Sequence, residues 1–255
     1  MSQPAFTVDT FYGQLGLPES CLLDKRIYKR MVLEHGQLTA ADKKMLSEDV
    51  GKLTWKFTLK PTTMQLLPYE DAEREYLEIA VIQADLNERR RVARIAEIIQ
   101  RAIPYPVLLI MVEGSALCVS VAPKRFSQAE KGAIVAEDFL LSPWIESSLL
   151  SLDQQFIEAL ALRSLPQADF YALYCGMVNS VLARTCAELT GKFELNAVRS
   201  TQDRRQRLEQ YHQIDRKIGS LRMAISKEDR FAEKVELNTR IKELETQLAV
   251  TKAAL

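Results

Sequence analysis

The chain has 255 residues, 47% of them hydrophobic, which suffices for one globular domain with an appendage or for two small domains. Its 34 basic residues balance 34 acidic ones, which excludes a strong overall attraction to nucleic acid or an anionic membrane and leaves only local patches for such contacts. The four cysteines lack the spacing of a zinc ribbon or redox pair, and no apolar run is long enough to span a bilayer. The first residues, Met1–Pro4, lack a basic region leading into an apolar one, so no signal sequence is expected. We therefore expect a cytoplasmic protein with reduced thiols and no membrane segment.

The first segment predicts two short helices. One is expected over Leu23–Glu34, ending at His35-Gly36, because glycine tolerates the left-handed backbone of a helix C-terminus. The other is expected over Ala40–Ser47, because Thr39 followed three residues later by Asp42 resembles a capping box.

The next segments predict a sheet. Apolar and polar residues alternate over Leu53–Lys60, which predicts a half-buried strand with lysines on its outer face. Tyr76–Leu86 is almost wholly apolar on both faces and is expected to form a central strand. An amphipathic helix should follow over Arg89–Ala102.

A β-hairpin and one further strand complete the expected sheet. Val107–Val112 and Ala116–Ala122 flank Glu113-Gly114-Ser115, where glycine permits a tight turn. The last strand is expected near Ala133–Phe139. Residues 1–145 are therefore predicted to form a compact α+β domain with a mixed sheet and helices.

After Ser151 the pattern becomes helical. Helices are expected around Leu152–Leu160 and Tyr171–Leu189, so residues 146–200 form a helical region. Residues 201–255 predict a long antiparallel helical hairpin of coiled-coil type, because apolar residues recur three and four positions apart in two runs that are out of phase, with a turn within Ser226–Arg230. The two narrow stripes are Tyr211, Ile214, Ile218, Leu221 and Ile225, and Leu237, Ile241, Leu244, Leu248 and Thr251.

Two acidic residues on the expected central strand are the best candidates for catalysis. A buried carboxylate is costly unless it is paired or binds a metal, so Glu78 and Asp85 could centre a metal-dependent nuclease site. The alternative is that Glu78 forms an ion pair across the sheet and Asp85 caps the following helix. The two histidines, His35 and His212, are interpreted as structural or solvent-exposed, and no cofactor or resident metal is expected.

Several basic clusters are candidates for contact with a nucleic-acid backbone, which would give salt-dependent binding. The most favoured cluster is Lys124 and Arg125, the second is Arg89, Arg90 and Arg91, and the third is Lys25, Arg26, Lys29 and Arg30. A solvated, charged surface without such a role is the alternative interpretation.

Several stretches together resemble a bacterial family known only as a domain of unknown function. They are Leu23–Ile27, Asp42–Lys44, Trp55–Pro61, Glu75–Ile79, Ala102–Val107, Lys124-Arg125, Lys234–Asn238 and Ile241–Leu244. The resemblance extends from Tyr12 to Leu248. It implies a genomic setting beside DNA methyltransferases and helicases of restriction-modification type in defence regions, and it supplies no catalytic residues.

The leading hypothesis is a non-catalytic accessory subunit of a restriction or anti-phage defence system. The hairpin would dock a helicase or DNA methyltransferase, with Lys217, Arg222, Arg240 and Lys242 selecting the partner by charge. A hairpin that forms a homodimer or packs on its own domain, the metal-dependent nuclease, and a nucleic-acid-binding module are the alternatives.

Overall fold

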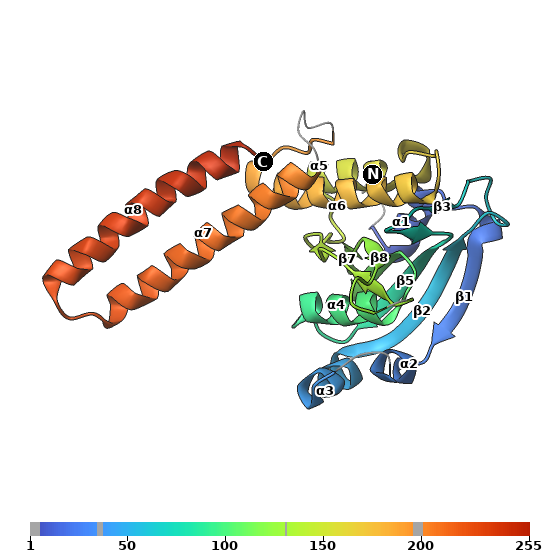
Figure 1. The fold of residues 1–255 in the computed structure, drawn as a ribbon, viewed down its shortest axis with the longest axis horizontal. Helices are drawn as coiled ribbons and strands as arrows, with labels where there is room; N and C mark the ends of the chain where they lie inside the picture. Colours follow the sequence, from blue (N-terminus) through green and yellow to red (C-terminus); the bar gives the residue numbers. More distant parts are fainter. Residues whose placement is uncertain (1–5, 35–37, 131, 196–200) are drawn as a thin grey trace. The chain divides into compact units, whose positions relative to one another are not determined.

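The computed structural model describes residues 6–34, 38–130, 132–195 and 201–255 (Figure 1). The chain divides into two compact units, Met1–Thr185 and Cys186–Leu255. Among the described helices, none is both long enough and apolar enough to cross a bilayer.

The first unit is built around a mixed six-stranded sheet with strand order β1-β2-β5-β6-β7-β10. β5 and β6 are parallel, and the other neighbouring strands are antiparallel. The strands are β1 (Leu22–Ile27), β2 (Val50–Leu59), β5 (Ile79–Leu86), β6 (Val107–Glu113), β7 (Ala116–Val121) and β10 (Leu140–Leu141). This observed architecture confirms the predicted α+β class.

Helices cover both faces of this sheet (Figure 1). On one face lie α2 (Lys29–Glu34), α3 (Ala40–Asp49) and α4 (Val92–Ala102), whose apolar residues form a buried core with the even-numbered residues of β5 and the odd-numbered residues of β6. On the other face lie α1 (Val8–Leu15), α5 (Ser151–Leu160) and the first part of α6 (Phe170–Thr190). Because both faces are covered, the central strands read as continuous apolar runs rather than alternating ones.

Small elements join these layers. Two 3₁₀ turns, η1 (Glu19–Cys21) and η2 (Leu162–Ser164), precede β1 and α6. Two further two-stranded sheets pair β3 (Tyr69–Glu70) with β4 (Glu75–Tyr76), and β8 (Lys124–Phe126) with β9 (Ile134–Ala136).

Local signals predicted several elements well. The capping box at α3 is present, since the backbone N–H of Asp42 donates to Thr39 Oγ1 at 3.1 Å and the Asp42 carboxylate accepts the backbone N–H of Thr39 at 3.2 Å. The β6–β7 hairpin turns at Gly114, whose φ of +60° suits glycine.

Two predictions of secondary structure are wrong. Leu23–Ile27 belongs to edge strand β1, and only Lys29–Glu34 is helical, because pairing with β2 outweighs helix propensity there. The strand expected near Ala133–Phe139 does not complete the main sheet, since β9 pairs with β8 and β10 takes that edge. The predicted helix end at His35-Gly36 lies outside the described residues.

A buried ion pair joins α5 and α6 within the first unit. Arg184 Nη2 donates to Asp153 Oδ1 at 2.8 Å, and both side chains are almost fully buried. The other carboxylate oxygen of Asp153 accepts the backbone N–H of Leu150 at 3.0 Å, at the start of α5. The Asp153 carboxylate therefore caps the start of α5 and also holds α6 through Arg184.

The second unit contains the predicted helical hairpin. α7 (Thr201–Lys227) and α8 (Phe231–Ala253) are joined by a turn at residues 228–230, within the predicted segment. The seam between them buries Ile214, Ile218 and Ile241, with Leu221, Ile225, Leu244 and Leu248 partly buried around them. These residues belong to the two predicted stripes.

Candidate functional sites

The two acidic residues proposed for catalysis lie at opposite ends of β5. Glu78 immediately precedes the strand and Asp85 is its penultimate residue. At about 3.3 Å per strand residue, their Cα atoms are roughly 20 Å apart. They cannot share a metal ion, so the geometry does not favour a nuclease site centred on both.

Asp85 belongs to a polar cluster on the sheet that sequence reasoning missed. Its carboxylate accepts Gln83 Nε2 at 2.6 Å, and Gln83 Oε1 accepts the hydroxyl of Tyr12 from α1 at 3.1 Å. Lys52 on β2 is the register partner of Asp85. Alternation on β5 places Gln83 and Asp85 on one face, but nothing in the sequence indicates that α1 brings Tyr12 there. Asp85 therefore does not act as the helix cap proposed as its alternative role.

Glu78 is partly buried, and this desolvation raises its pKa, opposed by the charge of Lys60. Among the described residues it forms no ion pair, so the cross-sheet pairing proposed for it is absent. The described residues also contain no group of three His, Cys, Asp or Glu side chains that could hold a metal ion.

Lys124 ranked first for nucleic-acid contact, but its side chain is only 2% exposed. The ammonium donates to the carbonyl of Gln100 and to that of Ile103 at 2.9 Å, at the C-terminal end of α4. Burial lowers the pKa of Lys124 to about 7. This cation satisfies a helix C-terminus, so Lys124 is withdrawn from the candidate binding surface.

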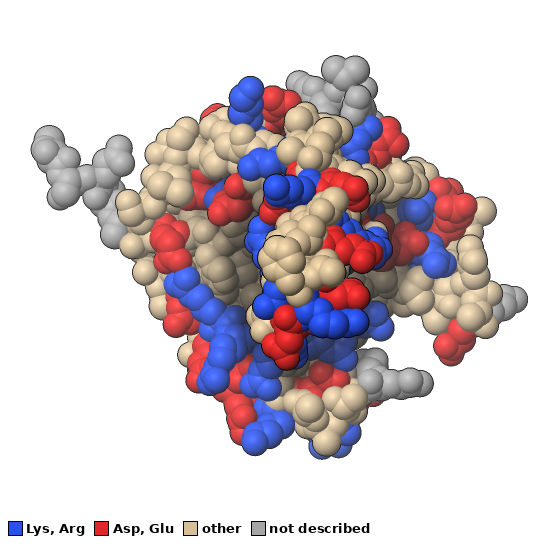
Figure 2. Space-filling view, turned by 90° about the vertical axis from the view of Figure 1, so that its left-hand side faces the viewer, with Lys and Arg blue, Asp and Glu red and all other residues tan. Residues whose placement is uncertain are grey.

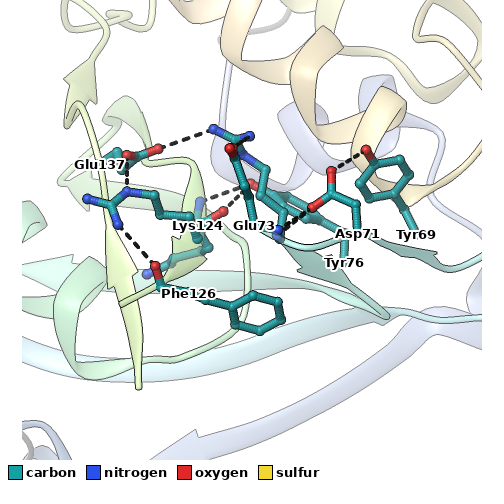
Figure 3. A network of polar contacts seen from close by, with 9 residues as sticks. Tyr69, Asp71, Glu73, Tyr76, Lys124, Phe126 and Glu137 are labelled. Atoms are coloured by element: carbon teal, nitrogen blue, oxygen red, sulfur yellow. Dashed lines mark hydrogen bonds and ion pairs between the residues drawn. The ribbon is translucent and has the colours of Figure 1, made fainter. Parts of the chain in front are cut away.

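Arg125 of β8 belongs to a polar network that also contains the labelled residues Glu73 and Glu137 (Figure 3). Its guanidinium donates to the carboxylate of Glu137 and, at 3.0 Å, to the carbonyl of Phe126. Arg74 pairs with the other oxygen of Glu137 at 3.6 Å and with Glu73 at 3.1 Å. Asp71 organises the β3–β4 turn by accepting the Tyr69 hydroxyl at 2.6 Å. The acids of this network already neutralise its arginines, which indicates a structural clamp between the β3–β4 and β8–β9 sheets.

The three consecutive arginines before α4 are also paired with acids. Arg89 contacts Glu113 at 3.0 Å and Glu146 at 2.6 Å. Arg90 pairs with Glu88, and Arg91 pairs with the buried carboxylate of Asp49 at 2.8 Å. In the third-ranked cluster Arg30 pairs with Glu34 on α2, and Lys29 donates to the carbonyl of Ser47 at 3.1 Å. Lys25 and Arg26 on exposed strand β1 are the members of the ranked clusters that remain available.

The hairpin residues proposed for partner selection divide into two groups. Arg222 of α7 pairs with Glu245 of α8 at 2.7 Å, so it braces the hairpin itself. Lys217, Arg240 and Lys242 are exposed and, within the described part of the chain, form no ion pair. His212 is also exposed on α7, whereas His35 lies outside the described residues.

The turn of the hairpin is ordered and carries an exposed aromatic ring. The Glu228 carboxylate accepts the backbone N–H groups of Asp229 at 3.0 Å and Arg230 at 2.9 Å. These bonds and the Arg230 side chain lower the pKa of Glu228. Phe231, the next residue, is 81% exposed, and Met223 and Val235 are exposed nearby along the two helices. Figure 2, where this end of the hairpin faces the viewer, shows uncharged side chains flanked by charges of both signs.

Fold and surface together define a sheet domain with helices on both faces, linked in sequence to a two-helix hairpin that exposes apolar side chains at its turn. The chain matches DUF4391, a domain of unknown function, over residues 15–248, and it belongs to that family. This confirms the resemblance found in the sequence. No curated protein and no solved structure matches the chain.

Proposed function

We propose that this protein is an accessory subunit that acts by docking a partner protein on the turn of its helical hairpin. The exposed ring of Phe231 carries the proposal. Leaving a large apolar side chain in water forgoes about 1.5–3 kcal/mol of burial free energy, and aromatic residues are frequent centres of protein interfaces.

The turn holds Phe231 in a defined position. Glu228 accepts two backbone N–H groups of the turn, and Arg230 pairs with Glu233 at 3.4 Å in the first turn of α8. A rigid presentation lowers the entropy lost on binding, so this ring suits a pocket on a partner.

Charges about three helical turns away from the hairpin turn would select the partner. Lys217, Arg240 and Lys242 carry ammonium or guanidinium groups free of ion pairs among the described residues. We infer that they face acidic residues of the partner, because complementary charge accelerates correct encounters and disfavours wrong ones.

A helicase or DNA methyltransferase of a restriction or anti-phage system is the partner we propose. The support for this identity is the genomic setting that the family resemblance implies. A second copy of this chain is the competing occupant of the turn.

The test compares two exposed apolar positions on the same helix. The protein is tagged and expressed with its neighbouring genes, and co-purifying proteins are identified by mass spectrometry. Phe231→Ser should abolish capture of the helicase or methyltransferase. Val250→Ser is the matched control, because Val250 is 68% exposed but lies about 28 Å further along α8.

Equal capture by both variants would reject the turn as the docking element. Sedimentation of the purified protein tests the competing occupant. A dimer that Phe231→Ser converts to a monomer would assign the turn to self-association instead.

A further inference from the structure

A local excess of positive charge lies on the β1–β2 edge of the sheet. Residues 22–30 and 50–60 together contain seven lysines and arginines and one acid, Asp24, although the chain as a whole has 34 basic and 34 acidic residues. This imbalance is local, so it does not appear in the overall composition.

Strand pairing distributes this charge over both faces of one sheet edge. Lys25 lies opposite Trp55 on one face, whereas Arg26 lies opposite Thr54 on the other face, which also carries Lys52. Lys56 pairs with Asp24 at 2.7 Å. Lys25, Arg26 and Lys52 are exposed and form no ion pair within the described part of the chain.

Exposed aromatic rings accompany these cations. The Arg26 guanidinium carbon lies 5.9 Å from the centre of the Tyr28 ring, which is 67% exposed. Tyr105, 42% exposed, packs its ring 5.8 Å from that of Trp55, the register partner of Lys25. Rings with open faces beside cations can stack bases while the cations contact phosphates.

The same edge is poorly suited to pairing with another strand. Its register shifts between Leu22 and Lys25, and Asp24 adopts a positive φ of 46°. A bulge and charged side chains are common means of blocking strand addition. The occupant must therefore recognise side chains rather than the open backbone edge.

We propose that the β1–β2 edge binds single-stranded nucleic acid, with Lys25, Arg26 and Lys52 contacting phosphates and Tyr28 stacking on a base. Charge complementarity selects a polyanion, and the exposed rings select unpaired bases over duplex. The two higher-ranked basic clusters are paired with acids or buried, so this edge is the ranked surface that the geometry favours. The proposal is independent of docking by the hairpin.

The test measures fluorescence anisotropy of the full-length protein with a labelled 20-nucleotide oligo-dT and with a duplex of the same length, between 50 and 200 mM salt. Reversing three charges, Lys25→Glu, Arg26→Glu and Lys52→Glu, should weaken single-strand binding at least tenfold. It should also reduce the slope of log affinity against log salt by about 2, since each lost contact contributes about 0.7. Tyr28→Ala should weaken binding about fivefold or more.

The matched control reverses three other exposed cations of the second unit, Lys192→Glu, Lys227→Glu and Lys252→Glu, and should bind like the wild type. Absence of wild-type binding at 50 mM salt overturns the proposal. So does a β1–β2 triple variant that binds as tightly as this control variant. Duplex bound as tightly as oligo-dT, with no effect of Tyr28→Ala, overturns the single-strand assignment. Circular dichroism confirms that the variants are folded.

Discussion

The sheet of the first unit and the seam of the hairpin bury their apolar residues to very different depths. Residues Leu109–Met111 at the centre of β6 have no exposed surface, and apolar helices lie on both sides of the sheet. Among the described residues of the hairpin, four apolar side chains fall below a tenth of their accessible surface: Leu208 and the three seam isoleucines. The sheet is therefore specified by burial, whereas the hairpin is a thin structure that leaves most of its surface for contacts.

Polar groups differ between the two regions in the same way. The first unit encloses the Asp153–Arg184 pair and the ammonium of Lys124, which makes each of them costly to leave unpaired. The hairpin keeps its ion pairs at the surface, as with Arg222 and Glu245. Substitutions in the two regions should therefore differ several-fold in how much they lower the free energy of unfolding.

Asp153→Ala should produce the largest change. Removing the carboxylate takes the Asp153 contact from the buried Arg184 guanidinium and removes a cap of α5, so the free energy of unfolding should fall by about 3–5 kcal/mol. Urea titration followed by tryptophan fluorescence reports this unit, because Trp55 and Trp144 both lie in it. Glu158→Ala on the same helix, whose partner Arg163 is exposed, is the control and should cost less than about 0.5 kcal/mol. Equal losses would refute the special role of the buried pair.

Truncating an isoleucine to alanine in the sheet and in the hairpin seam tests directly how deeply each region buries its apolar residues. Ile82→Ala should destabilise the first unit by about 3–4 kcal/mol, because packed neighbours surround the cavity. Ile241→Ala should destabilise the hairpin by about 1–2 kcal/mol, because its half-open seam can relax. Hydrogen exchange of α8 amides measures the second loss. A loss as large as that of Ile82→Ala would mean that another chain covers the seam in solution.

The sequence predicted the elements whose signals are local. The capping box at Thr39, the turn at Gly114 and the two hairpin stripes need only neighbouring residues for their recognition. Edge strand β1 was predicted as a helix because its structure depends on pairing with a strand more than twenty residues later.

Prediction of the candidate sites was limited by partners from distant segments. The sequence revealed where basic residues cluster, but not that Glu137 neutralises Arg125 or that Lys124 reaches the carbonyls of α4. The sequence therefore ranked Lys124-Arg125 first and Arg89–Arg91 second for nucleic-acid contact. The burial of Lys124 and the pairing of Arg89–Arg91 with acids reverse that order. Pairing between distant residues cannot be read from spacing alone.

The buried Lys124 should make the first unit more stable as pH rises. Its pKa is about 7 in the folded chain, below the ordinary value of 10.5. Between these values the unfolded chain holds a proton that the folded chain lacks, so a rise in pH disfavours unfolding by about 1.4 kcal/mol per unit. Between urea titrations at pH 7.5 and 9, Lys124 should contribute about 2 kcal/mol of added stability. The buried thiol of Cys118 opposes part of this gain, because burial raises its pKa.

Lys124→Met isolates this effect, because the variant lacks the titrating amine. Burial raises the pKa values of neighbouring Tyr76 and Tyr174, so both hydroxyls stay protonated in this range. The difference in stability between wild type and variant should therefore change with pH by about the same 2 kcal/mol. A constant difference would show that the ammonium keeps its proton in the interior.

Arg222→Ala should produce the smallest change in stability. Both Arg222 and Glu245 are largely solvated, and exposed pairs contribute only about 0.2–1 kcal/mol. Thermal unfolding followed by circular dichroism should therefore shift little, and the shift should shrink further at 0.5 M salt. If the variant instead unfolds the hairpin, the thin seam depends on charge as much as on its isoleucines. If stability is retained while partner capture falls, Arg222 serves recognition, and its pairing with Glu245 orients the guanidinium for that contact.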